Sequence, residues 1–119
     1  MTFVVDFAPP WKQTPSDLAE KTRQKDRKEF LQMKAKEAFT TSVPLITKCA
    51  VSIRYARSRG RADSANIIGG VLNSLQRIIF KDDNQVIEIN YTQWVGSGDW
   101  YQITVTELVR SSLESFLAT

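Results

Sequence analysis

Four polar side chains around one apolar segment are the residues most able to do chemistry. Asp63 and Asn66 lie at the start of this segment, and Asp82 and Asp83 follow its end. Their carboxylate and amide oxygens favour hard cations such as Mg²⁺, Mn²⁺ or Ca²⁺. The chain has no histidine, which excludes Ser-His and Cys-His catalytic pairs and the usual Cys/His zinc sites. Any catalysis is therefore expected to use carboxylates and an oxygen-bound metal.

The same residues also have a purely structural interpretation. Asp63 or Ser64 could cap a helix, and residues 82–84 have the composition of an ordinary turn. A helix over residues 66–79 would be about 20 Å long, so its two ends are not automatically neighbours. The chain after Phe80 would have to return to the helix N-terminus for the carboxylates to share a metal. From these residues alone, caps and turns are favoured over a metal site.

An arginine-rich loop lies just upstream of Asp63. Arg57, Arg59 and Arg61 could bind DNA phosphates, together with Arg54 in the preceding segment, because a guanidinium can bind phosphate oxygens in pairs. They could also form a solvated loop, although their density around Gly60 slightly favours phosphate contacts. Residues 1–62 carry 13 basic and 6 acidic side chains, whereas residues 63–119 carry 3 basic and 7 acidic ones. This asymmetry suggests a nucleic-acid surface beside a cation site, although folding could also mix the two charges.

The apolar patterns predict the elements that must position these residues. Alternation with a period of two predicts strands, and helical spacing predicts helices. The expected strands cover residues 2–7, 45–56, 86–92 and 100–106, and the expected helices cover residues 16–39, 66–80 and 108–117. Ser16 is the expected cap of the first helix, and residues 21–28 are polar enough to fray or form a mobile loop. The last two strands, joined through residues 96–99, are expected to form a β-hairpin.

This order predicts a small α+β domain, with a mixed sheet and helices packed on one face, that spans residues 1–119. No apolar run approaches the ~20 residues that a membrane span needs, so no membrane is expected as a partner. The start of the chain lacks the features of a signal peptide, and the single Cys49 is expected to fill the core. These features favour a cytoplasmic location.

Two motifs resemble those of the RusA family of Holliday-junction resolvases. The motifs are R-A-D-S-A-N-I-I-G-G-V-L-N-S-L at residues 61–75 and F-K-D-D-N-Q-V at residues 80–86. The family carries R-x-D-x-D-N-x-x-K-x-x-x-D-A-L and then W-K-D-D-x-Q-[VI], with the same gap between them. The order of the predicted elements also fits, so the resemblance extends over most of the chain.

The resemblance implies a homodimeric endonuclease that cuts branched DNA symmetrically with Mg²⁺ or Mn²⁺. By position, Asp63 and Asp83 correspond to catalytic metal ligands, Asp82 is a further metal ligand and Asn66 is a supporting residue. The arginines at positions 54, 57, 59 and 61 are then expected to face DNA. Two symmetric cuts need two sites related by a twofold axis, which also favours a homodimer.

Three family positions are altered in this chain. Ala65 replaces the second aspartate of the first motif, Gly69 replaces its lysine, and Asn73 replaces its last aspartate. Phosphodiester hydrolysis needs carboxylates to hold the metal and benefits from a cation near the phosphate. The expected function is therefore a RusA-like nuclease with attenuated activity, or alternatively an inactive DNA-binding protein of the same fold. A small interaction domain without a DNA role is the third hypothesis.

Overall fold

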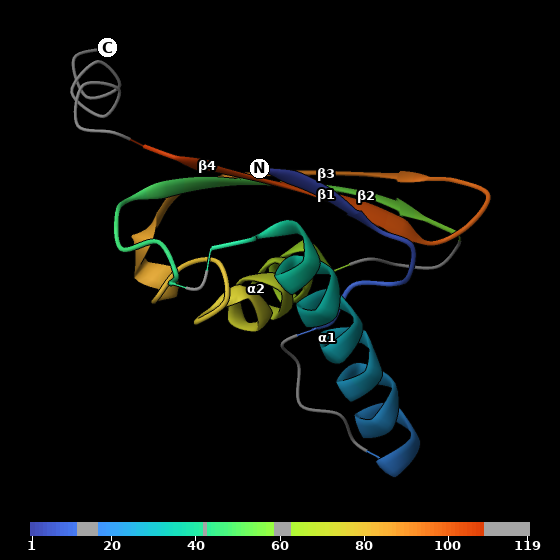
Figure 1. Ribbon diagram of the computed structural model, residues 1–119. Helices are drawn as coiled ribbons and strands as arrows, with labels where there is room; N and C mark the ends of the chain where they lie inside the picture. The colour runs from blue at the N-terminus through green and yellow to red at the C-terminus, as the bar shows by residue number, and fades with distance from the viewer. Residues whose placement is uncertain (12–16, 42, 59–62, 109–119) are drawn as a thin grey trace.

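The computed structural model describes residues 1–11, 17–41, 43–58 and 63–108 (Figure 1). Its elements, in chain order, are β1 (Thr2–Val5), α1 (Leu18–Ala38), β2 (Cys49–Arg57), α2 (Ser64–Leu75), the 3₁₀ turn η1 (Asp83–Gln85), β3 (Val86–Val95) and β4 (Trp100–Glu107). The strands form one mixed sheet, and both helices lie against the same face of it. The predicted α+β architecture is confirmed. Residues 109–119, where a last helix was predicted, lie outside the described residues.

The predicted hairpin is wrong, because β2 lies between β3 and β4. The order of strands in the sheet is β1-β4-β2-β3. Ile53 in β2 pairs with Ile103 of antiparallel β4 on one side and with Tyr91 of parallel β3 on the other. A central position suits β2, because Val51 and Ile53 are deeply buried within the core. Alternation along a strand shows which face is buried, but it does not show which strands become neighbours.

Helix α1 begins one residue after Asp17, which is its N-cap, whereas the predicted cap, Ser16, lies outside the described residues. The Asp17 carboxylate accepts a hydrogen bond from the backbone N–H of Glu20 at 2.7 Å. The polar stretch over residues 21–28, expected to fray or form a loop, is helical. Only Gln24, Leu31 and Ala35 of the helix are buried, and its N-terminal half projects away from the sheet (Figure 1).

Helix α2 ends at Leu75, earlier than predicted from the apolar spacing that continues to Phe80. Arg77 has a left-handed backbone conformation (φ 68°) and donates its N–H to the carbonyl of Phe80, so the chain turns back on itself. Ile79 and Phe80 therefore reach the core from a turn rather than from a helix. Earlier in α2, Gly70 is buried against the first loop, where a Cβ would overlap the carbonyl oxygen of Pro10.

One apolar cluster joins the sheet to both helices. It includes Cys49, which is buried as expected of a core residue. The cluster draws on both halves of the sequence, and the strands of the two halves alternate across the sheet. The basic and acidic halves of the sequence are therefore interleaved in space. Among the described residues, no helix combines the length and apolar character needed to cross a membrane.

Candidate metal and nucleic-acid site

Asp63 is the N-cap of α2. Its Oδ1 accepts a hydrogen bond from the backbone N–H of Asn66 at 3.2 Å, which satisfies one of the free donors at the helix start. The residue is exposed, and within the described part of the chain Oδ2 has no hydrogen-bond partner. The capping interpretation is thus confirmed for Asp63, while one oxygen of its carboxylate is left for a ligand.

Asp82 and Gln85 form a capping box around η1. Asp82 accepts a hydrogen bond from the backbone N–H of Asn84 at 2.9 Å, and Gln85 Oε1 accepts one from the backbone N–H of Asp82 at 2.8 Å. The buried Gln85 amide also donates to the carbonyls of Leu45 at 2.8 Å and Thr47 at 2.9 Å. This glutamine, a residue of the second motif, therefore ties η1 to the chain before β2.

Asp83 lies in η1 and is exposed. No hydrogen bond or salt bridge of its side chain occurs among the described residues, in contrast to the neighbouring Asp82, whose carboxylate is used for capping. Of the two adjacent aspartates, Asp83 thus has the carboxylate that is more available to an external ligand.

One copy of the chain does not bring Asp63 and Asp83 together. The 12 residues of α2, about 18 Å of helix, begin directly after Asp63. The chain then continues to η1, which Gln85 fixes beside Thr47 at the start of β2. Within residues 1–11, 17–41, 43–58 and 63–108, no group of three His, Cys, Asp or Glu side chains could hold a metal. The carboxylates of a single copy therefore do not fit a shared metal ion.

Of the four arginines predicted to bind DNA, the two that the structure describes lie on opposite faces of the sheet. Arg54 is exposed on β2, and its side chain alternates away from the buried face that Ile53 and Tyr55 present to the helices. Arg57 is half-buried at the end of β2 and belongs to the opposite, helix-covered face. Arg59 and Arg61 lie outside the described residues. Arg57 is thus adjacent to the loop before Asp63, while Arg54 points to the open face of the sheet.

Asp99 fastens the end of β2 to the start of β4, a role that the sequence reading missed. Its carboxylate accepts hydrogen bonds from the Tyr55 hydroxyl at 3.0 Å, and from the backbone N–H and the hydroxyl of Ser58 at 3.0 and 3.1 Å. Burial alone would raise the pKa of Asp99, but these hydrogen bonds outweigh it and hold the pKa below its ordinary value. Asp99 therefore holds the end of β2 in place, where the arginine-rich loop begins.

The aromatic residues near the same end divide into two groups. Tyr101 belongs to the core, and burial raises the pKa of its hydroxyl. Trp94 and Trp100 are exposed and meet edge to face, with ring centroids 5.6 Å apart. Tyr101 thus packs in the core, whereas the two tryptophans present an exposed aromatic surface.

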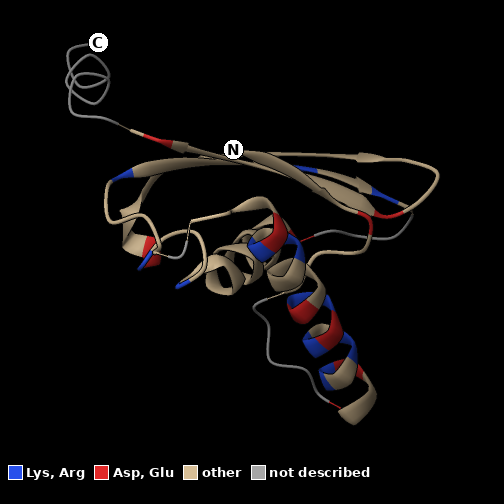
Figure 2. Cartoon of the chain, in the orientation of Figure 1, with Lys and Arg blue, Asp and Glu red and all other residues tan. Residues whose placement is uncertain are grey.

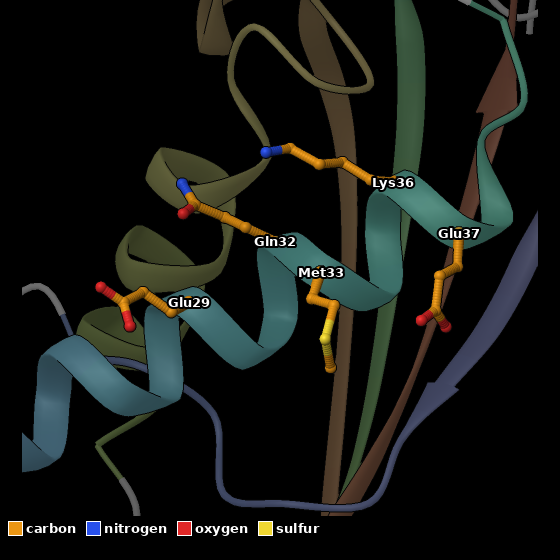
Figure 3. Close-up of a pocket in the computed structure, with 5 residues that line it drawn as sticks. All are labelled: Glu29, Gln32, Met33, Lys36 and Glu37. Carbon is orange, nitrogen blue, oxygen red and sulfur yellow. The ribbon is translucent and has the colours of Figure 1, made fainter.

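A hollow of about 490 Å³ lies along α1 (Figure 3). Its lining comes from this one helix, with Glu29, Gln32 and Lys36 among the residues. Gln32 donates a hydrogen bond to the carbonyl of Ser74 in α2 at 3.3 Å. The mixed charges of this surface offer no arrangement for catalysis.

Comparison with known families decides the class of protein. The family described as endodeoxyribonuclease RusA matches residues 5–106. The match runs from the end of β1 into β4 and covers well over half of the chain. This chain belongs to the RusA endodeoxyribonuclease family. The predicted resemblance is therefore confirmed. A search of curated proteins gave no match.

The three positions at which the sequence was expected to depart from the RusA motif lie along one stripe of α2. Ala65, Gly69 and Asn73 are spaced by four residues, which places them on successive turns of one helix face. The side chain of Asn73 accepts a hydrogen bond from Lys28 of α1 at 3.3 Å. A lysine from a different helix thus reaches the stripe from which the RusA motif lysine is missing.

Proposed function

We propose that this protein is a structure-specific endodeoxyribonuclease that acts on Holliday junctions or other branched DNA with Mg²⁺ or Mn²⁺. Its membership of the RusA family carries the proposal. Asp63 and Asp83 are the proposed catalytic metal ligands, because both are exposed and have carboxylate oxygens without internal partners in the described part of the chain. Asp82 is proposed as a further ligand and Asn66 as a supporting residue.

The proposed DNA surface surrounds the arginine-rich loop. Arg57, Arg59 and Arg61 precede Asp63 in the chain, so phosphates bound there would lie close to that carboxylate. Arg54 faces the other side of the sheet and is expected to contribute less. Phosphate contacts release counterions, so binding should weaken steeply as salt is raised.

The proposed active form is a homodimer. Symmetric cleavage of two opposing strands requires two sites related by a twofold axis. A metal ligated by both Asp63 and Asp83 would also need carboxylates from two copies, because α2 separates these residues within one chain. The dimer would therefore serve the metal site as well as the symmetry of the substrate.

The first experiment is incubation of the purified protein with a synthetic four-way DNA junction and Mg²⁺, then Mn²⁺. We expect paired nicks in opposing strands, which Asp83→Asn should abolish while the fold is retained. Asp6→Asn is the matched control, because Asp6 is also exposed but lies outside both motifs. Nicking that survives Asp83→Asn would contradict the proposed role of Asp83.

A junction-binding protein that does not cut is the second candidate, and the altered stripe of α2 supports it. Ala65 and Gly69 lack the carboxylate and ammonium of the RusA motif. Tight, salt-sensitive binding without nicks would favour this function. The double substitution Ala65→Asp and Gly69→Lys should then create or strongly raise cleavage. A folded, DNA-binding double variant without any gain would refute the idea that these two positions alone limit activity.

Failure to bind junction DNA even at low salt would contradict both candidate functions and favour the third hypothesis, a small interaction domain without a DNA role.

Two further expectations remain predictions of this proposal. The first is that residues 1–119 form a single domain, and the second is a cytoplasmic location. Fractionation of the cell that makes the protein tests the second.

A further inference from the structure

Arg57 lies on the helix-covered face of the sheet, at the end of β2. It continues the alternation of Ile53 and Tyr55, which are both buried on that face. The carbonyl of Arg57 accepts a hydrogen bond from the backbone N–H of Gly96 at 2.8 Å, and its side chain is half-buried. The sheet therefore fixes the position of Arg57 before the chain enters the arginine-rich loop.

Arg27 approaches the sheet from α1. It lies on one helix face with Gln24 and Leu31, which are three residues before it and four residues after it and are both buried. The side chain of Gln24 accepts a hydrogen bond from the backbone N–H of Trp11 at 2.8 Å, and Leu31 belongs to the apolar core. Arg27 itself is half-buried. The inward face of α1 thus carries a cation.

The hydrogen bonds of Asp99 show that this cation and Arg57 lie near the same place. Burial raises the pKa of Asp99, but hydrogen bonds from Ser58 and Tyr55 and the nearby charge of Arg27 lower it. Ser58 directly follows Arg57, and its backbone N–H donates to the Asp99 carboxylate at 3.0 Å. Arg27 of α1 and Arg57 of β2 therefore both lie near the pair formed by Tyr55 and Asp99.

Neither arginine has an ionic partner among the described residues. In Figure 2 basic and acidic positions are interspersed along α1. The salt bridges in the described ranges join other cations to other acids, namely Arg23 to Glu20, Lys25 to Glu29 and Lys34 to Glu37. The Nε atoms of Arg27 and Arg57, by contrast, are buried without a hydrogen-bond partner. A half-buried charge without a partner is unfavourable, so two of them near one place indicate an anion from outside the chain.

We propose that Arg27 and Arg57 form a binding site for the backbone phosphates of one DNA strand, and this proposal rests on the proposed function. Guanidinium groups bind phosphate oxygens in pairs, and half-buried charges are screened less by salt than exposed ones. A DNA strand is favoured over a free anion because the chain continues from Arg57 through Arg59 and Arg61 to Asp63. A strand held at Arg57 can therefore continue toward the candidate metal ligand.

The two arginines are held in place before DNA binds. They belong to different elements, α1 and β2, and the apolar core joins these elements. Hydrogen bonds fix the backbone of Arg57 and the helix turn that precedes Arg27. Such preorganisation lowers the entropic cost of ordering long side chains on binding. Arg27 thereby becomes a DNA-binding residue although it lies far from both sequence motifs.

The first test compares binding of a four-way junction by wild-type protein, Arg27→Gln and Arg57→Gln over a range of salt concentrations. Each substitution should weaken binding at low salt by about tenfold, because a charged hydrogen-bonding group is lost. Each should also lower the slope of log Kd against log salt concentration by about 0.9, the value for one phosphate contact.

Arg23→Gln is the matched control for this test. Arg23 is also an arginine of α1, but it is exposed and paired with Glu20, so its loss should change binding less than about twofold. A salt dependence that Arg27→Gln leaves unchanged would overturn the proposal. A slope lowered as much by Arg23→Gln as by Arg27→Gln would also overturn it, because the effect would then be one of general charge.

Thermal melts without DNA separate binding from a structural role of Arg27. Arg27→Gln should be at least as stable as the wild-type protein, because it removes a half-buried charge that has no partner in the described part of the chain. If this variant does not fold, Arg27→Lys replaces it in the test. Lysine keeps the charge but lacks the planar fork, so Arg27→Lys should keep the salt slope and bind more weakly. Affinity equal to that of the wild-type protein would overturn the proposal.

The second test identifies the source of the phosphate from the arginine Nε–H signals in NMR spectra of the wild-type protein. A short four-way junction should shift the signals of Arg27 and Arg57, whereas inorganic phosphate at the same concentration should not. The signal of Arg23 is the internal control and should shift less. Saturation of both signals by inorganic phosphate, with no further change when DNA is added, would assign the site to a free anion and overturn the proposal.

These tests separate the phosphate site from the nuclease. A wild-type protein that binds junctions through Arg27 but does not cut them would support the site and contradict the proposed nuclease. Paired nicks made by a protein whose DNA binding is insensitive to Arg27→Gln would support the nuclease and overturn the site.

Discussion

The hydroxyl of Tyr55 donates a hydrogen bond to Asp99 at 3.0 Å and so joins the end of β2 to the start of β4. A second tyrosine, Tyr101, lies fully buried in the neighbouring strand with a hydroxyl that has no partner among the described residues. Tyr55 and Tyr101 also pair across β2 and β4. The two tyrosines thus lie side by side, but only the hydroxyl of Tyr55 has a hydrogen-bond partner among the described residues.

Removing each hydroxyl should change stability in opposite directions. Tyr55→Phe should lower the free energy of unfolding by about 1.5 kcal/mol, because a hydrogen bond to a carboxylate is lost. Tyr101→Phe should leave it unchanged or raise it by about 1 kcal/mol, because an unpartnered buried hydroxyl carries a desolvation cost. Urea denaturation of both variants measures the difference. Equal losses would contradict the assignment of the two hydroxyl groups.

The lowered pKa of Asp99 predicts a stability that falls in acid. Burial disfavours the charged carboxylate and so raises the pKa, but the hydrogen bonds from Ser58 and Tyr55 lower it by more. The folded-state pKa of Asp99 therefore lies below the unfolded value. A carboxyl of this kind contributes stability above its unfolded pKa of about 3.9 and loses that contribution as the pH falls through the folded pKa. The wild-type chain should therefore lose more stability than Asp99→Asn between pH 7 and pH 3. Thermal melts over this range test it, and parallel curves for the two proteins would refute it.

Replacing Gly70 with alanine should destabilise the protein, although alanine is usually more favourable than glycine within a helix. Glycine within a helix ordinarily costs about 1 kcal/mol relative to alanine. Here a Cβ would overlap the backbone of Pro10, so Gly70→Ala should lower the free energy of unfolding by about 1 to 3 kcal/mol. Gly98→Ala is the control, because no atom lies within 4 Å of its added Cβ. Stabilisation by Gly70→Ala would mean that α2 does not contact the first loop in this way.

Two substitutions of Asp63 separate its capping role from its proposed metal role. Asp63→Ser retains a side chain that can cap α2, whereas Asp63→Ala should lower the free energy of unfolding by about 1 kcal/mol. If Asp63 also binds a metal, both variants should lose cleavage of a four-way junction. Measuring unfolding and cleavage side by side distinguishes the roles. Full cleavage by Asp63→Ser would restrict Asp63 to capping.

Local features of this chain could be predicted from the sequence because they depend on residues that are close to one another along the chain. The alternation of Cys49, Val51, Ile53 and Tyr55 predicted the buried face of β2, and the position of Asp63 before an apolar run predicted a helix cap. The helix end was misjudged, because Ile79 and Phe80 continue the helical spacing while the positive φ of Arg77 turns the chain. Apolar spacing reports burial and not backbone conformation.

The sequence by itself determined the composition of the candidate site, the α+β class and the absence of imidazole chemistry, because these follow from residue types and short periodicities. Only the tertiary structure decided that β2 separates β3 from β4, and that the 12-residue helix α2 lies between Asp63 and Asp83 within one copy. Strand order depends on how distant segments share hydrogen bonds and buried area, which no local pattern encodes.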